Sequence, residues 1–76
     1  MIAEHHRIVL RENVKEHGLK AGDVGTVVHV YSGGKGYEVE FVSLTGETAA
    51  IVTLSASQVR SAHKREIPHA RQLAVA

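Results

Sequence analysis

Apolar and polar residues alternate along several short stretches of the chain, and this alternation predicts β-strands. The clearest stretch is "YEVEFV", in which Tyr37, Val39 and Phe41 alternate with Glu38 and Glu40. Successive side chains of a strand point to opposite faces of its sheet. The three apolar side chains are therefore predicted to be buried, and the two glutamates to be exposed on the wet face of an antiparallel sheet.

Other stretches rich in β-branched residues are also typical of strands. They are "HRIVLREN", "TVVHVYS", "TAAIVTL" and "VR", at residues 6–13, 26–32, 48–54 and 59–60. In "TAAIVTL", Ala50, Val52 and Leu54 form the predicted inward set, which leaves Ile51 outside. In "TVVHVYS", His29 takes an outward position, where an imidazole close to a glutamate of the neighbouring strand would form a pH-sensitive contact.

Glycine-rich and polar stretches separate these strands. "VKEHGLKAGDVG" predicts a long ordered loop, "SGGKG" a hairpin connection, "SLTGE" a turn and "SASQ" a single helical turn. Five short strands with a long first loop and a helical turn before the last strand predict an all-β fold. We expect a small five-stranded SH3-like barrel over residues 6–60, which curls the sheet nearly closed and so protects its edges.

The last stretch, "SAHKREIPHARQLAVA" at residues 61–76, has a different character. It carries three basic residues against one acidic residue, a net charge of +2, whereas residues 1–60 carry six against seven, a net charge of −1. Pro68 suits the first turn of a helix, so we expect a short C-terminal helix after it. Isolated helices need roughly 12–15 residues, so we expect Leu73 and Val75 of this basic tail to dock on an apolar strip. The strip belongs either to the tail's own barrel or to a second copy near Val42 and Ile51, and we favour the second copy.

Length and composition set further bounds. A chain of 76 residues forms one domain with a small core and marginal stability. It contains no cysteine, so neither disulfides nor thiolate metal sites support the fold. The apolar runs are much shorter than the roughly 20 residues that span a bilayer, and the residues after Met1 do not form a signal segment. We expect a soluble cytoplasmic protein without membrane contact.

Four sequence blocks, "EHGLKAGDVGTVVHVY", "YEVEFV", "GETAAIVTL" and "SQVR", occur in an order and spacing found in a group of short bacterial proteins. On these blocks the chain resembles domain-of-unknown-function family 4926 over about residues 8–60. The resemblance implies a small SH3-like β-barrel. It implies no activity, because the family carries no assigned catalytic or binding residues.

The run "KAGDVGTVVHV" is also similar to the KOW motif, an RNA-contacting turn and strand of some ribosomal proteins and elongation factors, with Gly25 at the pivotal glycine. RNA-binding KOW loops are crowded with basic residues. Here Lys20 is accompanied by Asp23 and Glu16. We therefore favour a structural role for this run, as a turn that leads into a twisted strand.

The residues that bear reactive groups do not form a known catalytic or metal-binding pattern. "SGGKG" lacks the Walker spacing and joins two strands instead of opening a helix. The six histidines lack zinc-type spacing, and the serines lack the context of a catalytic triad. Glu38 and Glu40 have the spacing of a carboxylate pair, but they belong to a solvated strand face. We expect a protein that is not an enzyme and that carries no metal or cofactor.

The strands contain more apolar residues than one small core needs, and a surplus gathered in a patch marks an interface. The interface candidates are Val27, Val42, Ile51, Leu73 and Val75. The leading hypothesis is a protein-interaction module that self-associates, with a dimer favoured, or that acts as a regulatory or antitoxin-like partner of another protein.

The alternative hypothesis is weak nucleic-acid binding through the KOW-like turn and the basic tail. Its candidate residues are Lys20, Lys64, Arg65 and Arg71. The tail's cations would neutralise about three phosphates, which corresponds to a salt slope of about −2.7 and to low affinity. Glu38 and Glu40 would repel a phosphate backbone, so we expect no strong nucleic-acid binding.

Overall fold

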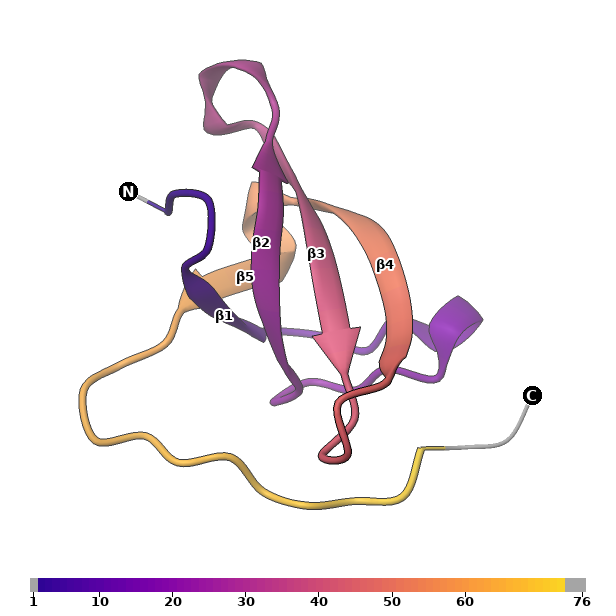
Figure 1. Cartoon of the computed structure of the whole chain (residues 1–76). Coiled ribbons are helices and arrows are strands. Elements are labelled where there is room, and N and C mark those ends of the chain that lie inside the picture. The colour runs from indigo at the N-terminus through magenta and orange to yellow at the C-terminus, as the bar shows by residue number, and fades with distance from the viewer. Residues whose placement is uncertain (1, 74–76) are drawn as a thin grey trace.

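The computed structural model describes residues 2–73 and shows an all-β protein with one five-stranded antiparallel sheet (Figure 1). The strands are β1 (Arg7–Leu10), β2 (Val24–Val30), β3 (Gly36–Val42), β4 (Thr48–Ser55) and β5 (Val59–Ser61). The connections contain short 3-10 helices: η1 (Lys15–His17), η2 (Ser32–Gly34) and η3 (Ala56–Gln58). Within residues 2–73 no helix is long and apolar enough to cross a membrane. The predicted strands are confirmed, with bounds that shift by a few residues.

The sheet has the order β4-β3-β2-β1-β5 and does not close into the expected barrel. Among the described residues, β4 pairs only with β3 and β5 pairs only with β1. Closure into a barrel would require β5 to pair with β4, the strand at the opposite end of the sheet. β5 is three residues long and follows η3 directly, so it is too short to extend along that edge. Figure 1 shows β1 and β5 lying across the upright β2, β3 and β4, and the two edges of the sheet stay separate.

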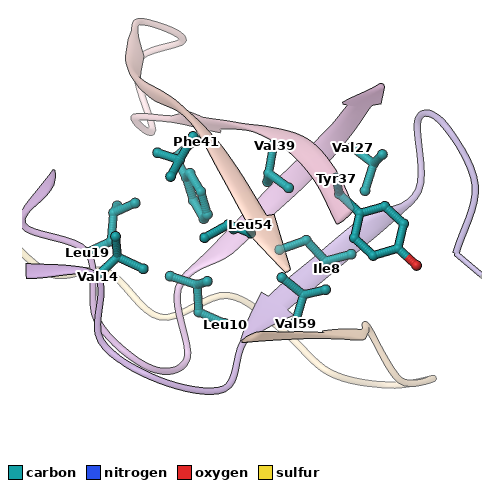
Figure 2. Packing of buried hydrophobic residues seen from close by; sticks show 11 residues of the cluster. Ile8, Leu10, Val14, Leu19, Val27, Tyr37, Val39, Phe41, Leu54 and Val59 are labelled. Carbon is teal, nitrogen blue, oxygen red and sulfur yellow. The ribbon is translucent and has the colours of Figure 1, made fainter. Parts of the chain in front are cut away.

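The core lies on one face of the sheet (Figure 2). As predicted, Tyr37, Val39 and Phe41 of β3 are buried, with exposed fractions of 5%, 0% and 3%. Glu38 and Glu40 lie on the opposite face, where they are half-buried and not fully exposed. The other members of the core cluster are Ile8, Leu10, Val14, Leu19, Val27, Val52, Leu54 and Val59.

Two of these core residues come from the long loop between β1 and β2. Val14 and Leu19 exchange both backbone hydrogen bonds, at 2.9 and 3.1 Å, and so form a small antiparallel bridge around η1. Gly18 permits this tight return because it adopts the left-handed conformation, with φ of 68°. The loop therefore contributes two apolar side chains to the core.

A β-bulge in β2 decides which side chains of that strand reach the core. Val27 pairs with Val39, but His29 pairs with Glu38, so Val28 is an extra residue between the two pairs. The extra residue turns His29 outward although Val27 points inward. Val27 is fully buried, and its assignment as an interface residue is therefore wrong.

The turn between β4 and β5 has the predicted helical form. Ser55 and Gln58 form a capping box around η3, and the backbone N–H of Ser55 donates to Gln58 Oε1 at 2.8 Å. A capping box satisfies backbone groups that the short helix leaves unpaired. The turn therefore directs the chain from β4 into β5.

In the described part of the basic tail, residues 61–73, Ser61 ends β5 and no helix follows it, so the predicted helix after Pro68 is wrong. The chain runs extended from β5 along the lower end of the sheet (Figure 1). Arg71 forms an ion pair with Asp23, and Leu73 packs half-buried against the core of its own chain. These fixed contacts replace the hydrogen bonds of a helix that is too short to be stable alone.

Candidate protein-interaction surface

The face of β2, β3 and β4 that points away from the core is called the outer face here. The strand register places Thr26, Glu40 and Ile51 in one row across it, and His29, Glu38 and Thr53 in the next. The outer face consists of Thr26, Val28, His29, Tyr31, Glu38, Glu40, Val42, Thr48, Ile51 and Thr53. Its central strand carries the two glutamates.

The glutamates are held in place by hydroxyl groups of their neighbours. Thr48 Oγ1 donates to Glu40 Oε2 at 2.6 Å. Thr53 Oγ1 donates to Glu38 Oε1, and the Tyr31 hydroxyl lies 3.5 Å from Glu38 Oε2. Within residues 2–73 neither carboxylate takes part in an ion pair. The centre of the outer face therefore presents two positioned negative charges whose remaining acceptor sites face solvent.

Exposed apolar side chains surround these carboxylates. The exposed fractions are 39% for Val28, 40% for Tyr31, 47% for Val42 and 55% for Ile51. Val42 and Ile51 thus have the outward positions that the sequence predicts. Their cross-strand neighbours keep them on one face, so the apolar groups form one mixed patch with the glutamates.

His29 lies outward, as predicted, at one side of the outer face. Its ring packs edge-to-face on Tyr31, with centroids 4.7 Å apart and an interplanar angle of 80°. Its Nδ1 atom lies 3.8 Å from Glu4 Oε2, which becomes an ion pair when the imidazole is protonated. The register also sets His29 opposite Glu38. His29 thus adds an aromatic contact and a titratable group to the outer face.

The two tail residues among the interface candidates have different outcomes. Leu73 packs half-buried against the core of its own chain, which is the alternative to the favoured docking on a second copy. Val75 lies outside the described residues. The tail therefore completes its own fold at Leu73, and the candidates that face solvent in the described structure are Val42 and Ile51.

Two nucleic-acid candidates meet at the KOW-like turn, but an acidic residue lies between them. Arg71 donates from Nε to Asp23 Oδ1 at 2.9 Å and from Nη2 to the Gly18 carbonyl at 3.1 Å. The backbone N–H of Lys20 donates to Asp23 Oδ2 at 2.8 Å. Burial alone would raise the pKa of Asp23, but the hydrogen bonds from Arg71 and Lys20 outweigh it and lower the pKa. The positive charge of Arg71 is thereby neutralised within the chain.

The other two candidates, Lys64 and Arg65, form an exposed turn after β5. This turn is fixed by Glu66, which accepts two hydrogen bonds from the Arg60 guanidinium at 3.0 and 2.8 Å. The guanidinium, together with the backbone N–H of His63, lowers the pKa of Glu66 to about 2. Lys64 and Arg65 thus belong to the turn that follows β5, whereas Arg71 is bound to Asp23 in the loop before β2.

Two of the serines take part in a structural contact. The Ser55 hydroxyl lies 3.0 Å from the Ser57 hydroxyl within the cap of η3. In the part of the chain that the structure describes, no three His, Cys, Asp or Glu side chains lie close enough to hold a metal ion. What the outer face offers chemically is apolar contact, hydrogen-bond acceptors and a titratable imidazole.

Sequence reasoning missed Val28 and Tyr31 as outer-face residues, and it missed the hydroxyl contacts of the glutamates. The alternation of β3 could have indicated the threonine contacts. It sets Glu38 and Glu40 on one face of the sheet, so hydroxyl groups on the same face of β4 are candidates to donate hydrogen bonds to them. The exposure of Val28 depends on the bulge, for which the sequence carries no clear mark.

Comparison with known proteins places the chain in a family. No curated protein and no solved structure matches it. A family model described as "Domain of unknown function (DUF4926)" matches residues 4–61, from just before β1 to the end of β5. This match covers well over half of the chain and agrees with the resemblance noted in its sequence blocks. The chain therefore belongs to the DUF4926 family.

Proposed function

We propose that the protein is a non-catalytic protein-interaction module that self-associates and that binds other proteins through its outer face. The observation that carries the proposal is the exposure of Val28, Tyr31, Val42 and Ile51 on one sheet face. Exposed apolar groups gathered on one face mark interaction sites. Tyr31, which follows the end of β2, adds an aromatic side chain of the kind that is enriched in protein interfaces.

The two glutamates give this surface its specificity. Glu38 and Glu40 already have ordered hydroxyl partners, so little side-chain freedom is lost when a partner binds. Their negative charges favour a partner that presents cations or N–H donors and disfavour nucleic-acid backbones. A regulatory or antitoxin-like role is a special form of this proposal, in which the outer face binds and neutralises a second protein.

Substitution of the outer face tests the proposal. The wild-type chain and a Val28→Lys/Val42→Lys double variant are used as baits in a lysate of the source organism, and the bound proteins are quantified. We expect the double variant to lose at least one protein that the wild type retains, because two ammonium groups break up the apolar patch. Leu44→Lys is the matched control, because Leu44 is 84% exposed but lies in the turn between β3 and β4.

Equal capture by the wild type and the double variant would contradict the proposal. The nucleic-acid alternative is measured in parallel by fluorescence anisotropy with short RNA and DNA. We expect no binding tighter than about micromolar at physiological salt. Tight binding that is lost in Lys20→Gln would favour the KOW-like turn instead.

A further inference from the structure

β4 is an edge strand that lacks the usual protection against pairing. It is the longest strand, with eight residues, "TAAIVTLS", and it forms one end of the sheet. It contains no charged residue and no proline. Edge strands of monomeric proteins are commonly short, or carry charges, bulges or prolines that prevent pairing with another chain. β4 has one irregularity, close to Thr48, and the rest of the strand is regular.

The hydrogen-bond pattern shows which backbone groups of β4 are free. Alternate residues of an antiparallel strand direct their N–H and C=O groups to the same neighbour. The N–H of Ala56 donates to Lys35 C=O on the β3 side at 3.2 Å, so Leu54 and Val52 also face β3. Ile51 and Thr53 therefore direct their backbone groups away from the sheet. Among residues 2–73 no group bonds to these outward N–H and C=O groups.

The opposite edge of the sheet is protected. β5 has only three residues and includes Arg60. The Arg60 guanidinium is tied to Glu66 at 2.8 Å and to the Ser61 carbonyl at 3.0 Å, and Arg11 Nε donates to the Val59 carbonyl at 3.2 Å. Charge and side-chain contacts thus cover the β5 edge, whereas β4 is left open.

We propose that β4 pairs antiparallel with β4 of a second copy, so that two sheets join into one. This inference rests on the self-association in the proposed function, and it names a second copy as the partner and the β4 edge as the contact. Antiparallel pairing of identical strands satisfies the free groups of both copies through one two-fold axis. Because β4 carries no charged residue, the β4 strands of two copies can pair without electrostatic repulsion. The pairing also brings the Ile51 side chains of the two copies together and joins their outer faces.

Removal of one outward N–H tests the pairing directly. Thr53→Pro deletes a donor that points away from the sheet, and proline is tolerated at such edge positions. Thr53→Val is the matched control, because it loses the hydroxyl bonded to Glu38 but keeps the N–H. Light scattering after size exclusion, over a roughly hundredfold range of concentration, should show a dimer for the wild type and for Thr53→Val. We expect Thr53→Pro to raise the dimer dissociation constant roughly tenfold or more.

A second variant covers the case in which Thr53→Pro fails to fold. Ile51→Lys places a charge on the edge strand, and like charges of two copies then meet across the axis. Val28→Lys is its control, because Val28 shares the outer face but lies in β2, two strands from the edge. Amide exchange gives a direct readout: the N–H groups of Ile51 and Thr53 should exchange more slowly as the concentration of the full chain rises.

The outcomes separate this inference from the proposed function. A dimer lost in Thr53→Pro and Ile51→Lys but kept in Thr53→Val and Val28→Lys supports β4 pairing. A dimer lost in Val28→Lys and kept in both edge variants overturns β4 pairing and leaves the outer face as the contact. A wild-type monomer at every concentration also overturns it, whereas the capture of a partner through Val28 and Val42 is measured independently.

Discussion

Gly25 lies in β2 opposite Ile8 of β1, with two core side chains from β3 against its α-carbon. A Cβ atom at this position would lie 2.5 Å from Val39 Cγ1 and 2.9 Å from Phe41 Cε2. Such distances require the core to shift, and overpacking typically costs about 1–3 kcal/mol. We therefore expect Gly25→Ala to lower the free energy of unfolding by this amount in urea denaturation.

The neighbouring position gives the comparison for this prediction. Thr26 follows Gly25 in β2 and belongs to the outer face, so Thr26→Ala should change stability by less than about 1 kcal/mol. Equal effects of the two substitutions would show that the core accommodates a methyl group beside Val39. In that case the packing reason for Gly25 would be wrong.

At the residue scale, the sequence identified Gly25 through its likeness to the KOW motif, and the structure gives a packing reason for a glycine there.

Val27 shows where the prediction from alternation fails. A regular strand sets Val27 and His29 on one face, so an outward His29 implies an outward Val27. The bulge at Val28 separates them. Bulges depend on the match of two strands across a sheet, so the pattern of one strand does not reveal them.

At the scale of elements, β3 could be predicted because its own alternation determines both of its faces. The bridge of Val14 and Leu19 could not, because it depends on contact between the long loop and the far end of the core. The tail was predicted as a helix from local propensity. Its ion pair between Arg71 and Asp23 is a long-range contact that local propensity does not include, and it holds the segment extended.

The ion pairs of the tail make its docking dependent on pH. Glu66 has a pKa lowered from 4.5 to about 2, and the pKa of Asp23 is also lowered. A carboxylate with a lowered pKa stabilises the folded form above its ordinary pKa, and this contribution is lost as the pH falls towards the folded value. We expect the tail to detach between about pH 4.5 and pH 2, which NMR shifts of the Leu73 methyl groups would follow.

A variant at neutral pH checks the cause of this transition. Arg71→Gln removes the cation that holds Asp23 and should shift the Leu73 signals at pH 7 towards those of the acid form. A transition that is complete above about pH 5, with none below it, would contradict a role of the two carboxylates.

At the scale of the whole molecule, the tail links segments that are far apart in the sequence, namely β5 and the long loop between β1 and β2. It begins at β5, is fixed there by Arg60 and Glu66, and then reaches the long loop at Asp23 before Leu73 packs on the core. A domain of this size buries only about 60% of the surface its unfolded chain exposes. Each additional contact between distant segments is therefore a large share of its stability.

A chain that ends at Ser61 should consequently be less stable but should associate as the full chain does. It loses the partial burial of Leu73 and the ion pair of Asp23, whose gross contribution is about 1–2 kcal/mol before the opposing entropy of ordering the tail is subtracted. For a domain this small the melting temperature should therefore fall by no more than about 10 °C. The β4 edge is untouched by the truncation, so light scattering should give the same dissociation constant for both chains. If the truncated chain instead becomes monomeric while the full chain is a dimer, the tail binds the second copy and β4 does not join the two sheets.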